Sequence, residues 1–295
     1  MIANWVPERI ALVVHPTRPI DEALRTLEQW SAEHGVPVVQ LGVREGRREV
    51  APPGTLGPAD LVVAIGGDGT VLAALRAAAK TQAPVLGVAC GSLGALSAVA
   101  ADGFTDALGR VWAGDWTARS LPALVIDAPD GPDDWAINDV VAVRRGAGQL
   151  VAEIAVDGEL YVRLAGDGLV VATPVGSSAY SMAAGGPVLA AGTRGFVCTP
   201  LAMHGGSAPP LVVPGDATVT VQVHPGYTGF DFEIDGQRLA LDALRLRITL
   251  HADKSTLVMF TPGGRGLEAL RRRRLITDSP RVLARDDRAA KPETS

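Results

Sequence analysis

The sequence has few lysines and few cysteines, and each shortage excludes a class of protein. Only three lysines (Lys80, Lys254 and Lys291) occur among 295 residues, and the net charge is -5. A nucleic-acid partner is therefore not expected, because such binding relies on many cationic contacts to phosphate. Any side chain that grips phosphate should be an arginine. The two cysteines, Cys90 and Cys198, are too few for a thiolate metal site and lie in apolar runs, as buried thiols of a reducing compartment do.

Long apolar segments and several well-known catalytic motifs are also missing. No run approaches the roughly 18 apolar residues of a membrane helix. The N-terminal segment carries Glu8 and Asp21 in place of a signal peptide. We therefore expect a soluble, cytoplasmic protein with no membrane partner. There is no Walker-type glycine loop with its lysine, no GxGxxG opening the first helix, no serine-hydrolase elbow and no zincin motif.

The chain is long enough, and with 47% hydrophobic residues apolar enough, to form two domains around substantial cores. The first part, 1–118, alternates strands and helices and predicts an α/β domain with a Rossmann-like parallel sheet. We expect strands over 9–14, 36–43, 61–65 and 84–88, and helices over 20–34, 71–80 and 102–113.

The part 119–255 consists of short alternating segments separated by turns such as Asp157-Gly158, and predicts a mostly antiparallel β domain. Its expected strands are 123–127, 135–144, 150–156, 160–164, 169–173, 218–223, 230–234 and 244–250, with one helix over 178–191. A strand at 256–260 and a basic helix at 266–275 are expected to return to the first domain within 256–278. From 279 to 295 the composition predicts a disordered tail.

A glycine-rich turn joins the third strand to its helix. It reads Gly66, Gly67, Asp68, Gly69 and Thr70. Backbone N–H groups of such a turn can close on phosphate oxygens, and the helix dipole favours the negative charge. A carboxylate beside phosphates makes sense if it accepts a proton from a hydroxyl or helps to hold a divalent cation. A tight turn with Asp68 as the helix N-cap is the alternative.

A second glycine turn, 90–94, follows the next strand, which places a ligand crevice between the two turns. Arg144, Arg145 and Arg163 lie nearest to the motifs as possible phosphate ligands, although each is equally consistent with a surface charge. His15 and His204 follow apolar strands and are candidates to line a cleft, but a lone histidine is more often structural.

The β domain contains three polar stretches that are candidates for nucleotide binding. Asn138 and Asp139 form a polar pair inside an apolar strand, and an amide beside a carboxylate can hold two neighbouring ribose hydroxyls. The stretch 166–181 is a strand that leads into a hydroxyl-rich loop and a helix, which again suits a nucleotide. The third stretch, 233–237, is by itself a hairpin turn.

Taken in order, these motifs resemble the NAD kinase family over about residues 9–276. GGDGT is similar to the turn of phosphofructokinases and of some lipid kinases, whereas TPVGSSAYSMAAGGP (173–187) is far more specific. The matching stretches are 66–70, 138–139, 167–181, 200–213 and 235–237. The resemblance implies a kinase that transfers a phosphoryl group from ATP or polyphosphate, with Mg²⁺, to the 2′-hydroxyl of the adenosine ribose of NAD, giving NADP.

The resemblance also implies a role for each matching residue. Asp68 would be the base, Asn138 and Asp139 would contact ribose hydroxyls, and no protein metal site is implied. Homodimers or homotetramers are expected, with substrate sites that can include a neighbouring subunit. Donor phosphates would lie on Gly66, Gly67, Gly69 and Thr70. The dinucleotide pocket would be lined by Asp167, Val175, Ser178, Ala179, Tyr180 and Ala95, with His204 and Gln237 as further possible contacts.

Four positions depart from the family pattern. Ala95 stands where the family has an aromatic residue, and Val175 stands where it commonly has Thr or Ser. Asp139 is shorter than the usual Glu, and Pro209 replaces an arginine. This drift around an intact GGDG centre leaves two alternatives open: a related kinase with another nucleotide or hydroxyl acceptor, and a nucleotide-binding regulator without turnover.

Overall fold

The computed structural model describes residues 5–42, 48–129, 134–224, 229–239, 243–260, 266–272 and 274–289. The chain divides into two compact units, Met1–Gly264 and Arg265–Ser295, which are described separately. The expected fold class, an α/β domain with a parallel sheet followed by a mostly antiparallel β domain, is confirmed.

A parallel sheet of four strands forms the N-terminal domain, in the order β4 (Pro84–Ala89), β3 (Asp60–Gly66), β1 (Arg9–Val14) and β2 (Val38–Gln40). Every residue of β3 is buried, as its uninterrupted aliphatic run predicts for a strand covered on both faces. A two-residue strand, β5 (Val99–Ala100), pairs with β4.

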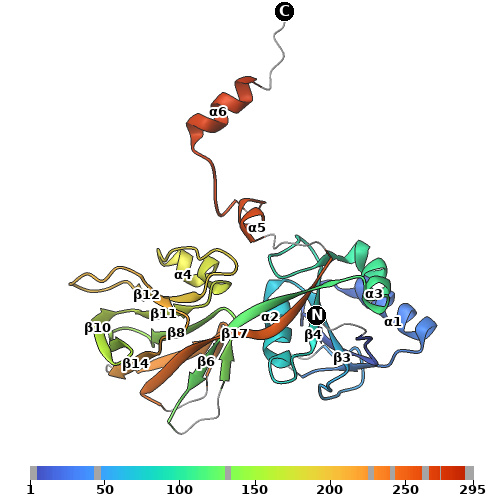
Figure 1. The fold of residues 1–295 in the computed structure, drawn as a ribbon, viewed down its shortest axis with the longest axis horizontal. Helices are drawn as coiled ribbons and strands as arrows, with labels where there is room; N and C mark the ends of the chain where they lie inside the picture. The colour runs from blue at the N-terminus through green and yellow to red at the C-terminus, as the bar shows by residue number, and fades with distance from the viewer. Residues whose placement is uncertain are drawn as a thin grey trace, which may run out of the picture. The chain divides into compact units, whose positions relative to one another are not determined.

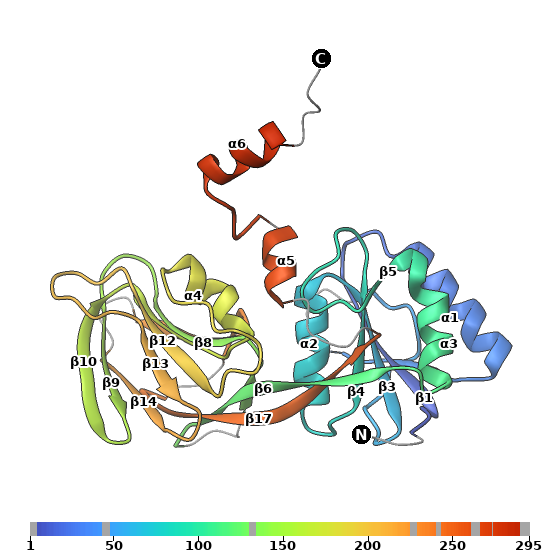
Figure 2. The ribbon, with the colours of Figure 1, turned by 45° about the horizontal axis from the view of Figure 1, so that its top comes forward.

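Helices cover both faces of this sheet (Figure 2). The side chains of Ile10 and Leu12 belong to one core with α1 (Asp21–His34) and α3 (Phe104–Trp112), which follows the 3-10 turn η1 (Ala101–Gly103). Ala11 and Val13 belong to the opposite core with α2 (Asp68–Ala78). Alternate residues of one strand thus supply the two faces, and the glycine turns are left at the carboxyl edge of the sheet.

In the β domain, a sheet of six strands packs against an extension of the first sheet. Val140 and Val171 from the six-stranded sheet share a core with Ile154 and Val219 from the other. The six strands are antiparallel, in the order β13-β12-β11-β8-β15-β16. The bounds are β6 Thr117–Asp127, β7 Asp134–Ala136, β8 Asp139–Arg144, β9 Leu150–Val156, β10 Glu159–Gly166, β11 Gly168–Ala172, β12 Gly195–Leu201, β13 Leu211–Pro214, β14 Val219–His224, β15 Phe230–Ile234, β16 Gln237–Arg238 and β17 Arg245–Met259.

One long strand, β17, belongs to both domains (Figure 1). It runs antiparallel to β14 in the β domain and parallel to β4 in the N-terminal domain, where Thr256 lies opposite Pro84. The sequence predicts two strands here, 244–250 and 256–260. His251 and Asp253 between them are exposed within a continuous strand, and its pairing with β6 is irregular between His251 and Ser255.

The helix predicted over 178–191 is much shorter in the structure. A 3-10 turn, η2 (Gly176–Ser178), precedes a single helical turn, α4 (Tyr180–Ala183). Gly185 then adopts a φ of 86°, which ends the helix, because side chains other than glycine rarely adopt this conformation. Strands β12 and β13 are additional to the strands expected from the sequence.

The second unit contains α5 (Gly266–Arg272) and α6 (Pro280–Ala289). In the segment for which the sequence predicts a disordered tail, 280–289 form α6, and Pro280 occupies the first helical position, where its missing N–H is not needed. Residues 261–265, 273 and 290–295 of the expected returning segment and tail lie outside the described residues, and the return of the helix to the first domain stays a prediction. Among the described helices, none has the length and apolar character needed to cross a bilayer.

Candidate active site

Three loops meet at the carboxyl edge of the parallel sheet: 15–20 after β1, 66–69 after β3, and 90–97 after β4. The backbone N–H of His15 donates to the carbonyl of Ile65 (3.0 Å), and that of Cys90 donates to the carbonyl of Gly66 (2.9 Å). The two glycine turns therefore lie side by side, as expected for neighbouring parallel strands.

Two glycines are required by close contacts at this edge. A Cβ on Gly66 would lie 2.4 Å from Oγ1 of Thr70 and 3.0 Å from Cβ of His15. A Cβ on Gly94 would lie 1.8 Å from Oδ1 of Asp68, so the second glycine turn approaches the carboxylate more closely than any side chain permits. The buried Thr70 hydroxyl forms no hydrogen bond within the described part of the chain.

Asp68 is the first residue of α2, and its carboxylate reaches across to the second glycine turn. Oδ2 accepts a hydrogen bond from the backbone N–H of Ala95 (3.1 Å), and Oδ1 accepts one from that of Leu96 (3.1 Å). The N-cap of α2 is Gly67, so the alternative of Asp68 as N-cap is wrong. The result is a half-buried carboxylate, fixed in orientation, at the positive end of a helix.

Asn138 lies in the break between β7 and β8, and Asp139 is the first residue of β8, so the pair does not lie inside one strand. The carboxylate of Asp235 makes this break by accepting hydrogen bonds from the backbone N–H groups of Ile137 (3.0 Å), Asn138 (2.7 Å) and Asp139 (3.3 Å). Asp235 itself sits in a tight turn with a φ of 51°. The turn that looks structural in the sequence thus shapes the backbone of the candidate ribose site.

The loop 173–180 packs directly against Asn138. The Thr173 hydroxyl donates to the carbonyl of Ile137 (2.7 Å), and the Thr173 N–H donates to that of Asn138 (2.9 Å). A Cβ on Gly176 would lie 2.0 Å from the Asn138 carbonyl oxygen. The structure therefore brings the segment of Val175, Ser178, Ala179 and Tyr180 to Asn138 and Asp139, with Tyr180 exposed.

Asp167 and His204 lie at the opposite end of this region. In the ladder of β11 with β8, Gly168 pairs with Val143 whereas Ala172 pairs with Asp139. Asp167 lies opposite Arg144, six residues along the chain from Asn138, and at about 3.4 Å per residue this separates Asp167 from Asn138 by about 20 Å. Asp167 is paired with Arg144 (2.6 Å), which lowers the pKa of its carboxyl. One chain therefore does not bring all of the predicted pocket residues together.

Three carboxylates, those of Asp139, Asp235 and Glu233, lie near one another at the candidate ribose site. Burial, reinforced by the negative charges of Asp235 and Glu233, raises the pKa of Asp139 to about 7. Burial also raises the pKa of Asp235, although its three backbone N–H donors and the charge of Arg76 oppose the shift. Asp139 consequently changes its protonation near neutral pH, where a carboxylate of ordinary pKa stays ionised.

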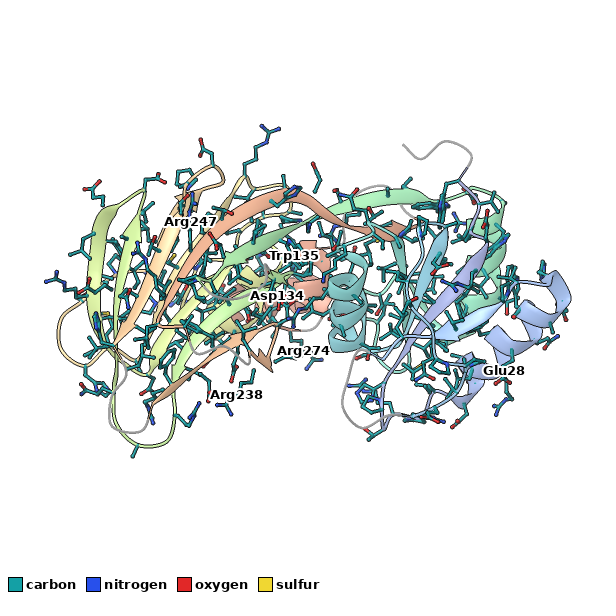
Figure 3. All side chains as sticks on the ribbon, turned by 90° about the horizontal axis from the view of Figure 1, so that it is seen from below. Glu28, Asp134, Trp135, Arg238, Arg247 and Arg274 are labelled. Carbon is teal, nitrogen blue, oxygen red and sulfur yellow. The ribbon has the colours of Figure 1, made fainter. Side chains whose placement is uncertain are left out.

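Arg76, in the last turn of α2, connects this helix to the β domain. Its guanidinium donates to Oδ2 of Asp134 (2.6 Å) and to Oε1 of Gln237 (3.2 Å). Figure 3 shows Asp134 beside α2. Gln237, predicted as a possible nucleotide contact, therefore holds Arg76. The helix α2 thus carries Asp68 at its start and, near its end, Arg76, which contacts the β domain.

The three arginines considered in the sequence analysis each form an ion pair with a carboxylate. Arg144 pairs with Asp167, Arg145 with Asp231, and Arg163 with Glu153. The arginine that lies at the glycine turns is Arg18, which sequence reasoning missed. It lies four residues after the end of β1, and no local signal marks it, because its place depends on the pairing of β1 with β3.

Comparison with known proteins decides the family. The model of the ATP-NAD kinase N-terminal domain matches residues 48–116, and that of the ATP-NAD kinase C-terminal domain matches 137–265. An NAD kinase of Koribacter versatilis is 34% identical over 245 residues, covering 77% of this chain and 84% of the relative. The chain belongs to the NAD kinase family. An NAD kinase of Neisseria meningitidis serogroup B is 32% identical over 271 residues, covering 86% of this chain and 91% of that protein.

Solved structures of NAD kinases share the fold. Yeast NADH kinase complexed with NADH aligns with a TM-score of 0.75 at 21% identity, covering 94% of this chain and 90% of the other. An NAD kinase from Archaeoglobus fulgidus in complex with ATP aligns with a TM-score of 0.70 at 24% identity, covering 91% and 100%. The family assignment made from the motifs is confirmed, and with it the assignment as a kinase of NAD.

The departures from the NAD kinase pattern leave the Asp68 contacts intact. Position 95 contributes its backbone N–H to Asp68, a contact that does not depend on the side chain. Val175 precedes η2. Its backbone carbonyl accepts a hydrogen bond from the Ser178 hydroxyl (3.1 Å), a contact that also does not depend on the Val175 side chain. The residues present at 95 and 175 therefore keep these backbone contacts.

Proposed function

We propose that this protein transfers the terminal phosphoryl group of ATP to the 2′-hydroxyl of the adenosine ribose of NAD and that Asp68 is the base. The observation that carries the proposal is the Asp68 carboxylate, fixed by the N–H groups of Ala95 and Leu96 at the start of α2. Relatives named NAD kinase, and similarly folded kinases bound to ATP or NADH, support it.

Phosphoryl transfer needs positioning and neutralisation of charge more than covalent chemistry by the protein. The backbone N–H groups at the start of α2 and the helix dipole can receive phosphate oxygens. The buried hydroxyl of Thr70 lies against Gly66. Asp68 is held from the other side by the second glycine turn, so its carboxylate keeps one orientation when it takes the proton of the acceptor hydroxyl.

The acceptor ribose is assigned to the Asn138–Asp139 break and the loop that follows β11. Asp235 shapes the backbone of the break, and Gly176 allows the loop to lie against Asn138. Ser178, Ala179 and Tyr180 then line the dinucleotide. The ionised form of Asp139 is the better acceptor for ribose hydroxyls, so the NAD affinity should rise as the pH passes its pKa of about 7.

Mg²⁺ fits this donor site as a companion of the nucleotide. Among the described residues, no three His, Cys, Asp or Glu side chains form a group that could hold a metal ion. Mg²⁺ commonly needs just one or two carboxylates together with substrate phosphates. Asp68 is the carboxylate at this edge, and bound Mg²⁺ would neutralise phosphate charge during transfer. The donor is ATP, with polyphosphate as an alternative.

A homodimer or homotetramer would complete the pocket. Asp167 and His204 lie about 20 Å along the β8–β11 ladder from Asn138. We assign their part in dinucleotide binding to the site of a neighbouring subunit. We propose this assembly, and also the cytoplasmic location that the composition favours.

A related kinase with a different acceptor is the second candidate. The small side chain of Ala95, half-buried beside Asp68, and the apolar Val175 favour it, because both stand where the family has groups that contact the nucleotide. The same Asp68 chemistry would then act on another nucleotide or hydroxyl compound.

A coupled assay with ATP, Mg²⁺ and NAD, read through an NADP-specific dehydrogenase, tests the proposal. We expect robust NADP formation, reduced by roughly 100- to 10,000-fold in Asp68→Asn, as for loss of a general base. Nucleotide binding should remain. Asp106→Asn, which removes an exposed acid from the first turn of α3, is the matched control and should retain full activity.

Other outcomes separate the alternatives. Transfer to a different acceptor without NADP formation would favour the second candidate. Tight NAD binding with no transfer to any acceptor would identify a regulator, and substantial activity of Asp68→Asn would remove Asp68 from the role of base.

A further inference from the structure

Arg18 lies over both glycine turns. A Cβ on Gly67 would be 3.3 Å from its Nη1 and 3.5 Å from its Cζ, and a Cβ on Gly91 would be 3.7 Å from Nη1. The guanidinium therefore rests against bare backbone on the first turn and beside the second. Arg18 thus reaches the same edge of the sheet as Asp68.

The loop that carries Arg18 is itself held in place. The ring Nδ1 of His15 accepts hydrogen bonds from the backbone N–H groups of Thr17 (3.2 Å) and Arg18 (3.1 Å). The carbonyl of Arg18 accepts a hydrogen bond from Nη1 of Arg48 (3.1 Å), and Arg48 pairs with Asp21 on α1. The backbone of Arg18 is thus anchored, and its side chain has a fixed starting point.

Most of the hydrogen-bonding capacity of Arg18 is left for a ligand. A guanidinium has five N–H donors, and the contact recorded for this one is a long bond from Nη1 to the carbonyl of Cys90 (3.5 Å). Within the described part of the chain, Arg18 forms no ion pair, in contrast to Arg144, Arg145 and Arg163. An exposed guanidinium without a carboxylate partner, set at an anion-binding turn, is the arrangement that receives phosphate.

We propose that Arg18 binds the phosphates of the donor nucleotide and holds them across the two glycine turns. Its planar fork would form two parallel hydrogen bonds to one phosphate group, while the backbone N–H groups at the start of α2 hold the neighbouring oxygens. The residue belongs to donor binding because β1, β3 and β4 lie in the α/β domain, whereas Asn138 and its loop lie in the β domain. This inference rests on the proposed function and assigns a donor ligand within it.

Steady-state kinetics of Arg18→Gln with ATP and NAD provide the first test. We expect the KM for ATP to rise roughly 10- to 100-fold, as for loss of hydrogen bonds to a charged group, with the KM for NAD unchanged within about twofold. The KM for ATP of Arg18→Lys should lie between those of the wild type and Arg18→Gln, because a lysine keeps the positive charge but lacks the planar pair of N–H donors. Arg25→Gln, the same change at an exposed position of α1, is the matched control and should behave as the wild type.

Calorimetric binding of inorganic tripolyphosphate provides the second test, because it requires no turnover. The wild type and Arg25→Gln should bind it, and Arg18→Gln should bind at least about tenfold more weakly. If the wild type forms no NADP but tripolyphosphate binding depends on Arg18, the proposed function fails and the phosphate site stands. Equal tripolyphosphate binding by wild type and Arg18→Gln, no binding by the wild type, or a rise in the KM for NAD alone would overturn the inference.

Discussion

Two carboxylates, Asp68 in the α/β domain and Asp235 in the β domain, use the same contact in opposite ways. Each accepts hydrogen bonds from consecutive backbone N–H groups of a distant segment. At Asp68, the N–H groups of Ala95 and Leu96 hold the carboxylate, which is the group being positioned. At Asp235 the carboxylate is the fixed point, and the backbone of Ile137 to Asp139 is what it positions. The first arrangement suits a carboxylate that itself takes part in a reaction. The second suits a binding site formed by the backbone segment that the carboxylate holds in place.

The two carboxylates also differ in their electrostatic surroundings. Asp68 stands at the start of α2, where the helix dipole favours its charge. Asp235 shares a half-buried space with Asp139 and Glu233, and burial raises the pKa of both aspartates. We therefore expect the proposed ribose site to be the more sensitive to pH, and three variants test this contrast.

Gly94→Ala should have the largest effect, because it breaks the first arrangement. The new Cβ would lie 1.8 Å from Oδ1 of Asp68 and would have to displace the carboxylate. A displacement of about 1 Å in a catalytic group can cost about 100-fold in rate. We expect that loss in kcat, with the circular dichroism spectrum unchanged. Gly109→Ala in α3, where a Cβ meets nothing within 4 Å, is the control; a normal kcat for Gly94→Ala would show that Asp68 tolerates displacement.

Asp235→Asn should have the next largest effect, because it breaks the second arrangement. The three N–H groups of 137–139 would lose a charged acceptor, and the new amide would present N–H groups of its own toward them. We expect a loss of about 2–4 kcal/mol in the free energy of unfolding by urea. The KM for NAD should rise while that for ATP stays unchanged. Asp216→Asn, at an exposed turn, is the control, and a parallel rise in both KM values would argue against a local role.

Asp139→Asn should have the smallest effect and shows the pH dependence of the ribose site. The wild-type pKa rises from 3.8 to about 7 on folding, so between these values the folded state holds a proton that the unfolded state has lost. Wild-type stability therefore falls as the pH rises from about 4 to about 7, and levels off above. The Asn variant lacks this loss, so its advantage in unfolding free energy should grow by about 1–3 kcal/mol between pH 5 and pH 8.

Urea unfolding at several pH values measures that difference, with Asp216→Asn as the control. The variant should also bind NAD more weakly at pH 8, because it lacks the ionised carboxylate. A difference in stability that does not vary with pH would mean that Asp139 is ionised throughout the range.

Local patterns were enough to predict most of the α/β domain from the sequence. The buried aliphatic runs at Arg9–Val14 and Asp60–Gly66 and the glycine turn after the second form as expected. Local signals were less informative in the β domain. Pro200 and the prolines at 209 and 210 obscure β12 and β13, since proline cannot donate to a sheet ladder. Gly185 shortens the predicted helix, and the polar middle of β17 resembles a turn.

The contacts that shape the site could not be predicted, because they join residues far apart in the chain. Asp235 lies 97 residues from Asn138, and Arg76 lies 161 residues from Gln237. A hairpin turn such as 235–236 carries no local sign that its carboxylate will organise a distant backbone. Arg18 likewise becomes significant only when the order β4-β3-β1 is known, since that order places its loop beside both glycine turns.

The sharing of β17 between the domains has a mechanical consequence. β6 and β17 remain paired from Thr117–Met259 at one end to Asp127–Arg247 at the other. A two-stranded ribbon of this kind bends and twists elastically, whereas a single-chain linker swivels freely. Any change in the angle between the domains must therefore strain the ribbon. Local melting at either end would also release strands from both cores, so the domains should lose their structure together.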